Sequence, residues 1–107
     1  MIVAVYDRPA KKLLFTLEER VKMVRDSLKD ITNVRVAEYT GLTVDYMRQV
    51  DAFAMVRGLR VFSDFELEFR MGLANKKLAP QIETVSIMTD IQHISISSST
   101  IREIAEL

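Results

Sequence analysis

The chain has 107 residues, of which 49% are apolar, so it can form one domain with a substantial core. Its 15 lysine and arginine residues balance 15 aspartate and glutamate residues, and this zero net charge argues against a nucleic acid as partner. The sequence contains no cysteine, which excludes disulfides and thiolate metal sites, and no apolar run reaches the length of a membrane span. The N-terminus lacks the pattern of a signal peptide, so we expect a soluble, cytoplasmic protein without a membrane partner.

The first half of the chain predicts a strand, a helix, a second strand and a short helix. The opening run IVAVY is β-branched and apolar without helical period, as in a strand buried on both faces. Thr16 and Glu19 have the spacing of a capping box, and apolar residues recur behind them at helical intervals. The next strand shows the alternation of a half-buried or edge strand. In chain order these elements are residues 2–6, 16–30, 33–39 and 40–50, the last of which opens with a turn.

The second half repeats the pattern with two more strands, each followed by a helix. AFAMV is an apolar run that predicts another buried strand, and Ser63 with Glu66 forms a second capping box. The stretch ISISSST leads into a last helix, which the cluster from Ser97 to Thr100 opens. The predicted strands are residues 52–56 and 83–89, and the predicted helices are residues 63–77 and 101–107.

This alternation of strands and helices predicts an α/β fold, a Rossmann-like doubly wound parallel sheet in a single domain. In such sheets ligands bind beyond the carboxyl ends of the strands. Cations and hydroxyls gather there although the chain is neutral. After the four strands in turn come Arg8, Lys11 and Lys12; Thr40, Gly41 and Thr43; Arg57, Gly58 and Arg60; and His93, Ser95 and Ser97–Thr100.

These residue types predict a phosphate ester or nucleotide as ligand. Arg57 and Arg60 can bind phosphates in bidentate fashion, Gly58 permits close approach to the backbone, and the serines precede the free N–H groups of a helix. Each feature also has an ordinary structural interpretation, because arginines at strand ends are commonly solvated and serines before helices commonly serve as caps. Their convergence on one edge of the sheet favours the ligand site.

Four segments resemble bacterial phosphopantetheine adenylyltransferase and cover essentially the whole chain. They are KKLLFTLEER (11–20), VRGLRVFSDFELEF (56–69), NKKLAPQIETVSIM (75–88) and ISISSSTIREIA (94–105). Members of that family transfer the adenylyl group of ATP to 4′-phosphopantetheine, with Mg²⁺, giving dephospho-coenzyme A and pyrophosphate in coenzyme A biosynthesis. The resemblance implies an adenylyltransferase that positions its substrates and stabilises charge at the α-phosphate. It also implies a homo-oligomer, the hexamer of the family.

The same resemblance implies roles for individual residues and gives no protein ligand for a metal. Lys11, Arg57 and Ser98 would be catalytic, and Arg57 would bind the phosphate of 4′-phosphopantetheine. The phosphopantetheine site would comprise Lys11, Leu42, Thr43, Arg57, Met71 and Asn75. The ATP site would comprise Gly58, Leu59, Arg60, Glu68, His93, Ile94, Ser95, Ile96, Ser97, Ser98 and Ser99.

The chain departs from the family at its start. The family begins with a strand, a GSFDP turn and a T-x-G-H motif, whereas the one histidine here, His93, lies in the segment expected at the adenine. The missing strand would be central in the order 3-2-1-4-5, so residues 2–6 and 52–56 would lack the neighbour between them. We therefore expect an incomplete nucleotidyltransferase domain over residues 1–107, a piece of a longer polypeptide or a truncated product. Rearranged pairing, a swapped partner or oligomerisation would cover its open strand edges.

Three functions are compatible with these observations. The first is adenylyl transfer to 4′-phosphopantetheine, for which the family's N-terminal segment with its T-x-G-H histidine has to be supplied from elsewhere. The second is a catalytically inactive fragment that only binds phosphopantetheine, coenzyme A or nucleotide. The third is another nucleotidyltransferase of the same fold, such as a glycerol-phosphate cytidylyltransferase, which the combination of RGLR and ISSS disfavours. Formation of dephospho-coenzyme A distinguishes the first from the second, and preference for ATP over CTP distinguishes it from the third.

Overall fold

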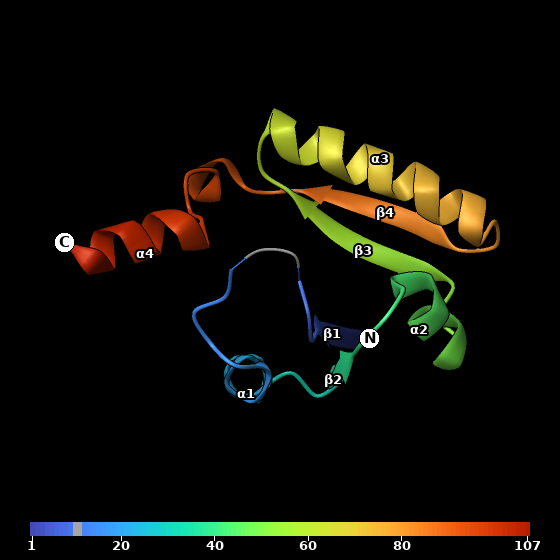
Figure 1. The fold of residues 1–107 in the computed structure, drawn as a ribbon, viewed down its shortest axis with the longest axis horizontal. Coiled ribbons are helices and arrows are strands. Elements are labelled where there is room, and N and C mark those ends of the chain that lie inside the picture. Colours follow the sequence, from blue (N-terminus) through green and yellow to red (C-terminus); the bar gives the residue numbers. More distant parts are fainter. Residues whose placement is uncertain (10–11) are drawn as a thin grey trace. The chain divides into compact units, whose positions relative to one another are not determined.

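The computed structural model describes residues 1–9 and 12–107, which divide into two compact units, Met1–Val50 and Asp51–Leu107 (Figure 1). Each unit contains a parallel two-stranded sheet whose strands are joined through a helix. This βαβ connection confirms the α/β class and the parallel pairing predicted from the sequence. None of the helices in the described part of the chain combines the length and the apolar character that crossing a membrane requires.

Unit one consists of β1 (Ile2–Tyr6), α1 (Leu17–Ser27), β2 (Arg35–Tyr39) and α2 (Thr43–Gln49). The two strands pair in parallel from Ile2 opposite Arg35 to Tyr6 opposite Tyr39. Its buried apolar residues come from both helices, and they are Val21, Val44 and Met47. All four elements lie within or close to the ranges that the sequence predicted.

Three tyrosines form an aromatic cluster at the end of this sheet. Tyr39 lies between Tyr6 and Tyr46, with ring centroids 5.1 Å and 4.9 Å apart. Its hydroxyl also forms a hydrogen bond of 3.0 Å with the Thr43 hydroxyl in the first turn of α2. Arg20 on α1 donates hydrogen bonds to the carbonyls of Tyr6 and Asp7, which ties α1 to the end of β1. The carboxyl ends of β1 and β2 are thus fixed by side-chain contacts.

Helix α1 starts where the capping box predicted. Thr16 is its N-cap, and the Thr16 hydroxyl accepts the backbone N–H of Glu19 at 3.2 Å. On the exposed face, Lys22 Nζ donates to Asp26 Oδ2 at 2.8 Å, and this bond raises the pKa of Lys22 above its ordinary value.

Replacing Thr16 with alanine should lower the free energy of unfolding of unit one by about 1 kcal/mol, because one N–H group of the first turn loses its acceptor. Urea titration followed by circular dichroism measures this change. Thr16→Ser keeps the hydroxyl and serves as the matched control. Equal stability of the alanine and serine variants would contradict the assignment of the cap.

Unit two consists of β3 (Ala54–Leu59), α3 (Phe62–Leu78), β4 (Glu83–Met88), the 3₁₀ helix η1 (Ile91–His93) and α4 (Ser98–Glu106). β3 and β4 pair in parallel from Ala54 opposite Glu83 to Leu59 opposite Met88. Helix α3 runs along this strand pair, and η1 leads from β4 toward α4 (Figure 1).

Three predictions for unit two are corrected by the structure. The third strand does not end at Val56 but continues through Arg57 and Gly58, whose backbones pair with β4. Helix α3 is not capped by Ser63, because it begins one residue earlier with Val61 as an N-cap that makes no side-chain hydrogen bond. The last helix starts at Ser98 and not at residue 101, because Ser97 is its N-cap.

The burial of the strands also differs from the prediction. The strand 2–6 is only partly buried. In unit two, Thr84 and Ser86 face α3. Because successive side chains of a strand point to opposite faces, Val85 and Ile87 lie on the other face of the sheet. There Val85 and Ile87 are 48% and 57% exposed, and Val56 beside them is 50% exposed. The predicted burial is therefore wrong for residues 2–6 and for Val56 in the predicted strand 52–56, and within unit two the helix α3 covers only one face of the sheet.

Candidate nucleotide and phosphate site

The first feature of the site is a bidentate ion pair between β3 and α3. Arg57 donates from Nε to Glu68 Oε2 at 3.0 Å and from Nη2 to Glu68 Oε1 at 2.7 Å. The Glu68 side chain is only 15% exposed, whereas that of Arg57 is 50% exposed. This fork geometry fixes the plane of the guanidinium and leaves half of its surface open to solvent and ligands. Two residues that were predicted to bind different substrates are thus joined directly.

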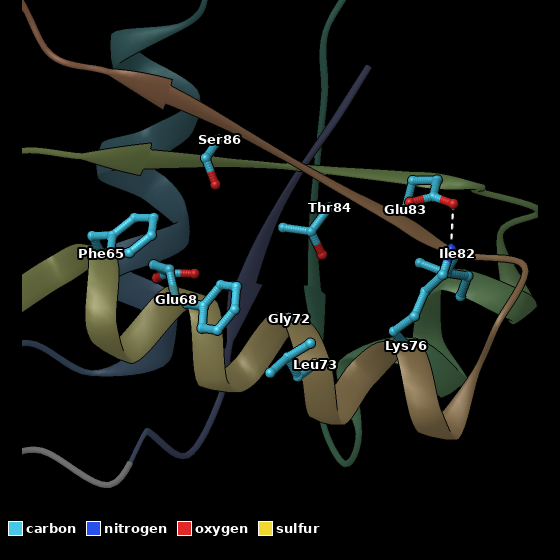
Figure 2. Close-up of a pocket in the computed structure, with 10 residues that line it drawn as sticks. Phe65, Glu68, Gly72, Leu73, Lys76, Ile82, Glu83, Thr84 and Ser86 are labelled. Carbon is cyan, nitrogen blue, oxygen red and sulfur yellow. Dashed lines mark hydrogen bonds and ion pairs between the residues drawn. The ribbon is translucent and has the colours of Figure 1, made fainter.

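Glu68 also lines a groove of about 250 Å³ between α3 and β4. The groove has an apolar wall, formed by Phe65, Phe69 and Leu73, and Figure 2 shows the hydroxyls of Thr84 and Ser86 pointing toward α3. Lys76 and Glu83 form an ion pair across it. Among the predicted site residues that the structure describes, Glu68 alone belongs to this lining. The groove is therefore not the predicted phosphate site.

The second feature is a set of contacts around Arg60, which follows β3. The carboxylate of Asp64 accepts the backbone N–H of Arg60 at 3.0 Å and lies 3.3 Å from Arg60 Nε. Arg60 Nη1 donates to the carbonyl of Ile96 at 2.8 Å. Arg60 thereby connects the segment after β3 with the segment after β4, which are the two segments predicted to hold ATP.

The third feature is the start of α4. Ser97 Oγ accepts the backbone N–H of Thr100 at 3.2 Å and donates to the Thr100 hydroxyl at 3.0 Å. Ser98 and Ser99 are the first two residues of the helix, where backbone N–H groups have no intrahelical acceptor. His93 ends η1, and its carbonyl accepts the N–H of Ile96. The predicted ATP residues from His93 to Ser99 thus form one continuous segment, which runs from the end of η1 through a turn to the first residues of α4. The N-terminus of a helix is suited to anions.

The remaining predicted residues lie in several elements. In unit one, Leu42 is the N-cap of α2 and Thr43 its first residue, and Gly41 before them has φ of 78°, which favours glycine. In unit two, Met71 and Asn75 lie on α3, and Met71 is 52% exposed. Lys11 lies outside the described residues. Gly58 and Leu59 are strand residues of β3, so they do not form a loop around ATP as the predicted boundary implied.

Sequence analysis missed Asp64, which makes two contacts to a predicted ATP residue. The helical rule for residues four apart does not indicate this contact, because Arg60 precedes Val61, the N-cap of α3, and so lies outside the helix. Arg20 was missed as well. The apolar stripe of α1 indicates which side of the helix faces inward, but it does not indicate that the Arg20 guanidinium contacts the carbonyls of Tyr6 and Asp7.

Comparison with known proteins places these features in a family. The family model described as cytidylyltransferase-like matches residues 1–104. The phosphopantetheine adenylyltransferase of Dictyoglomus turgidum is 48% identical over 106 residues, which are 99% of this chain and 66% of that protein. That of Dictyoglomus thermophilum is 50% identical over 105 residues, 98% of this chain and 64% of that protein.

A further relative, the phosphopantetheine adenylyltransferase of Roseiflexus sp. (strain RS-1), is 49% identical over 107 residues, which are 100% of this chain and 67% of that protein. The chain thus spans about two thirds of the length of the curated relatives it matches. Identity near one half along the whole chain is accompanied by a parallel βαβ fold. The chain therefore belongs to the cytidylyltransferase-like family and, within it, to the phosphopantetheine adenylyltransferases.

Proposed function

We propose that this protein transfers the adenylyl group of ATP to 4′-phosphopantetheine, giving dephospho-coenzyme A and pyrophosphate in coenzyme A biosynthesis. The observation that carries the proposal is identity of 48–50% to phosphopantetheine adenylyltransferases over nearly the whole chain. The geometry of unit two supports it, because the half-exposed Arg57 lies on β3, Arg60 follows β3, and the serine-rich N-terminus of α4 follows β4. These are the donors that phosphate esters require.

In the proposed reaction the protein acts by positioning and by stabilising charge. The phosphate of 4′-phosphopantetheine attacks the α-phosphate of ATP through one of its oxygens, and pyrophosphate leaves with the electrons of the broken bond. Arg57 binds the attacking phosphate, Ser98 and Ser99 bind the leaving phosphates, and Lys11 stabilises the transition state. Leu42, Thr43, Met71 and Asn75 are proposed to line the pantetheine arm.

Magnesium is proposed to enter as part of the substrate, Mg·ATP. In the described part of the chain no group of three or more His, Cys, Asp or Glu side chains lies together as a metal site requires. Mg²⁺ at phosphoryl-transfer sites is commonly held by substrate phosphates and water with few protein ligands. The hexamer remains a prediction from the resemblance. The cytoplasmic location and the absence of nucleic-acid and membrane partners remain predictions from composition, charge and the N-terminal sequence.

The proposal is tested by incubating the chain with 4′-phosphopantetheine, Mg²⁺ and either ATP or CTP, and by measuring dephospho-coenzyme A by mass spectrometry together with released pyrophosphate. We expect product with ATP and at least roughly tenfold less with CTP, which corresponds to about 1.4 kcal/mol of discrimination. Lys77→Ala, an exposed change near the end of α3, is the control that should leave the rate unchanged. Calorimetric binding of 4′-phosphopantetheine without product would contradict transfer by this chain, and preference for CTP would contradict the nucleotide.

A further inference from the structure

Asp64 makes two different contacts to one residue, Arg60. Its Oδ2 accepts the backbone N–H of Arg60 at 3.0 Å and also lies 3.3 Å from the guanidinium Nε. The two side chains are 27% and 39% exposed, so the pair is partly shielded from water. Because Val61, the N-cap of α3, makes no side-chain hydrogen bond, the Asp64 carboxylate is the group that reaches back over the start of the helix. Asp64 therefore fixes both the main chain and the side chain of Arg60.

Arg60 in turn holds a segment that is far away in the sequence. Its Nη1 donates to the carbonyl of Ile96 at 2.8 Å, across 36 residues. Ile96 also donates its N–H to the carbonyl of His93, and Ser97, the next residue, caps α4. The position of the Ile96 carbonyl is thus coupled to both ends of the turn between η1 and α4. A guanidinium has five N–H donors, which is more than these contacts use.

We infer that Asp64 is a positioning residue that orients Arg60 so that Arg60 clamps the turn from Ile94 to Ser97. The clamp is a property of unit two alone. Its further consequence, a turn shaped in advance to receive ATP, rests on the proposed function. Asp64 touches neither nucleotide nor phosphopantetheine in this inference, and it acts through Arg60 only.

Hydrogen exchange of the backbone amides, measured by mass spectrometry without nucleotide, tests the clamp directly. In Asp64→Ala we expect exchange in the segment from Ile94 to Thr100 to become roughly tenfold faster, because the turn opens more often when its clamp is loose. Asp64→Glu, which retains the carboxylate, should recover part of the protection. Glu66→Gln removes a negative charge from the same part of α3 and is the matched control, which should leave exchange in the turn unchanged.

A second variant keeps the test decisive if Asp64→Ala does not fold. Arg60→Lys retains the charge but cannot contact Asp64 and Ile96 together through a planar fork, so it should also accelerate exchange in the turn. In the double variant the two effects should not add, since both remove the same clamp. Unchanged exchange in the turn in both single variants, whatever their melting temperatures, would overturn the inference.

Calorimetric affinity for ATP separates the clamp from the proposed function. If wild type binds ATP, Asp64→Ala should weaken binding about fivefold to twentyfold, and Glu66→Gln should not. If exchange rises as expected but wild type does not bind ATP, the clamp is supported and the proposed nucleotide site is contradicted. If ATP binds equally well to wild type and to Asp64→Ala, the role of the clamp in shaping the nucleotide site is contradicted.

Discussion

Replacing Arg57 with alanine is expected to lower the affinity for 4′-phosphopantetheine by roughly 10- to 150-fold, the equivalent of about 1.5–3 kcal/mol for a hydrogen bond to a charged group. The variant removes the proposed phosphate anchor. It also leaves the Glu68 carboxylate, which is only 15% exposed, without its bidentate partner. That uncompensated negative charge would lie close to the place where a phosphate is proposed to bind, so both changes act in the same direction. Isothermal titration calorimetry measures the affinity.

Two further variants separate the contributions of charge and geometry. Arg57→Lys keeps a positive charge but loses the fork that pairs with Glu68, so its affinity should lie between those of wild type and the alanine variant. Lys77→Ala removes an exposed cation from the far end of α3 and should bind as wild type does. If Arg57→Ala binds 4′-phosphopantetheine as tightly as the Lys77→Ala control, Arg57 is not the phosphate anchor.

Replacing Tyr39 with alanine should lower the free energy of unfolding of unit one by about 2–4 kcal/mol, because the central ring of a three-tyrosine cluster is lost. Tyr39 stacks on Tyr46 and contacts Tyr6, and its hydroxyl bonds to Thr43. These are the three tyrosines of a chain that has no tryptophan, so the near-ultraviolet circular dichroism of tyrosine reports on this cluster. Urea titration followed by that signal therefore measures unit one.

Tyr39→Phe is the matched control. It keeps the ring contacts and removes only the hydrogen bond to Thr43, so it should cost about 0.5–1.5 kcal/mol. Because Thr43 is proposed to line the pantetheine site, this variant should also weaken 4′-phosphopantetheine binding slightly while most of the stability remains. An equal loss of stability in Tyr39→Phe and Tyr39→Ala would mean that the ring contacts contribute nothing.

The type and order of the elements could be predicted from the sequence because they depend on local patterns. The capping box at Thr16 and the β-branched run of β1 act over a few residues, and both are confirmed. The boundary of β3 could not be predicted, because Arg57 and Gly58 interrupt an apolar run without preventing the backbone from pairing with β4. Burial could not be predicted either. An apolar residue such as Ile87 favours burial, but the sequence does not indicate which element would cover it, and in the structure Ile87 is exposed.

The candidate site was predicted as a set of residue types but not as a set of contacts. The resemblance and the cation-rich connections indicated Arg57, Arg60 and the serine cluster, and the structure describes all of them in unit two. The pairing of Arg57 with Glu68 depends on how a strand and a helix are aligned, and this alignment is set by packing across the sheet and not by spacing along the chain. The bond from Arg60 to Ile96 joins residues 36 apart, which no local pattern can indicate.

Helix α3 has a consequence for the order in which unit two acquires its structure. With 17 residues it occupies most of the chain between β3 and β4. Helices of this length form within about a microsecond, whereas parallel strands must first close the long segment between them. A formed α3 replaces that flexible segment with a rod and so lowers the entropy lost when the strands meet. We therefore expect α3 to be present in the folding transition state, so that weakening it slows refolding as well as accelerating unfolding.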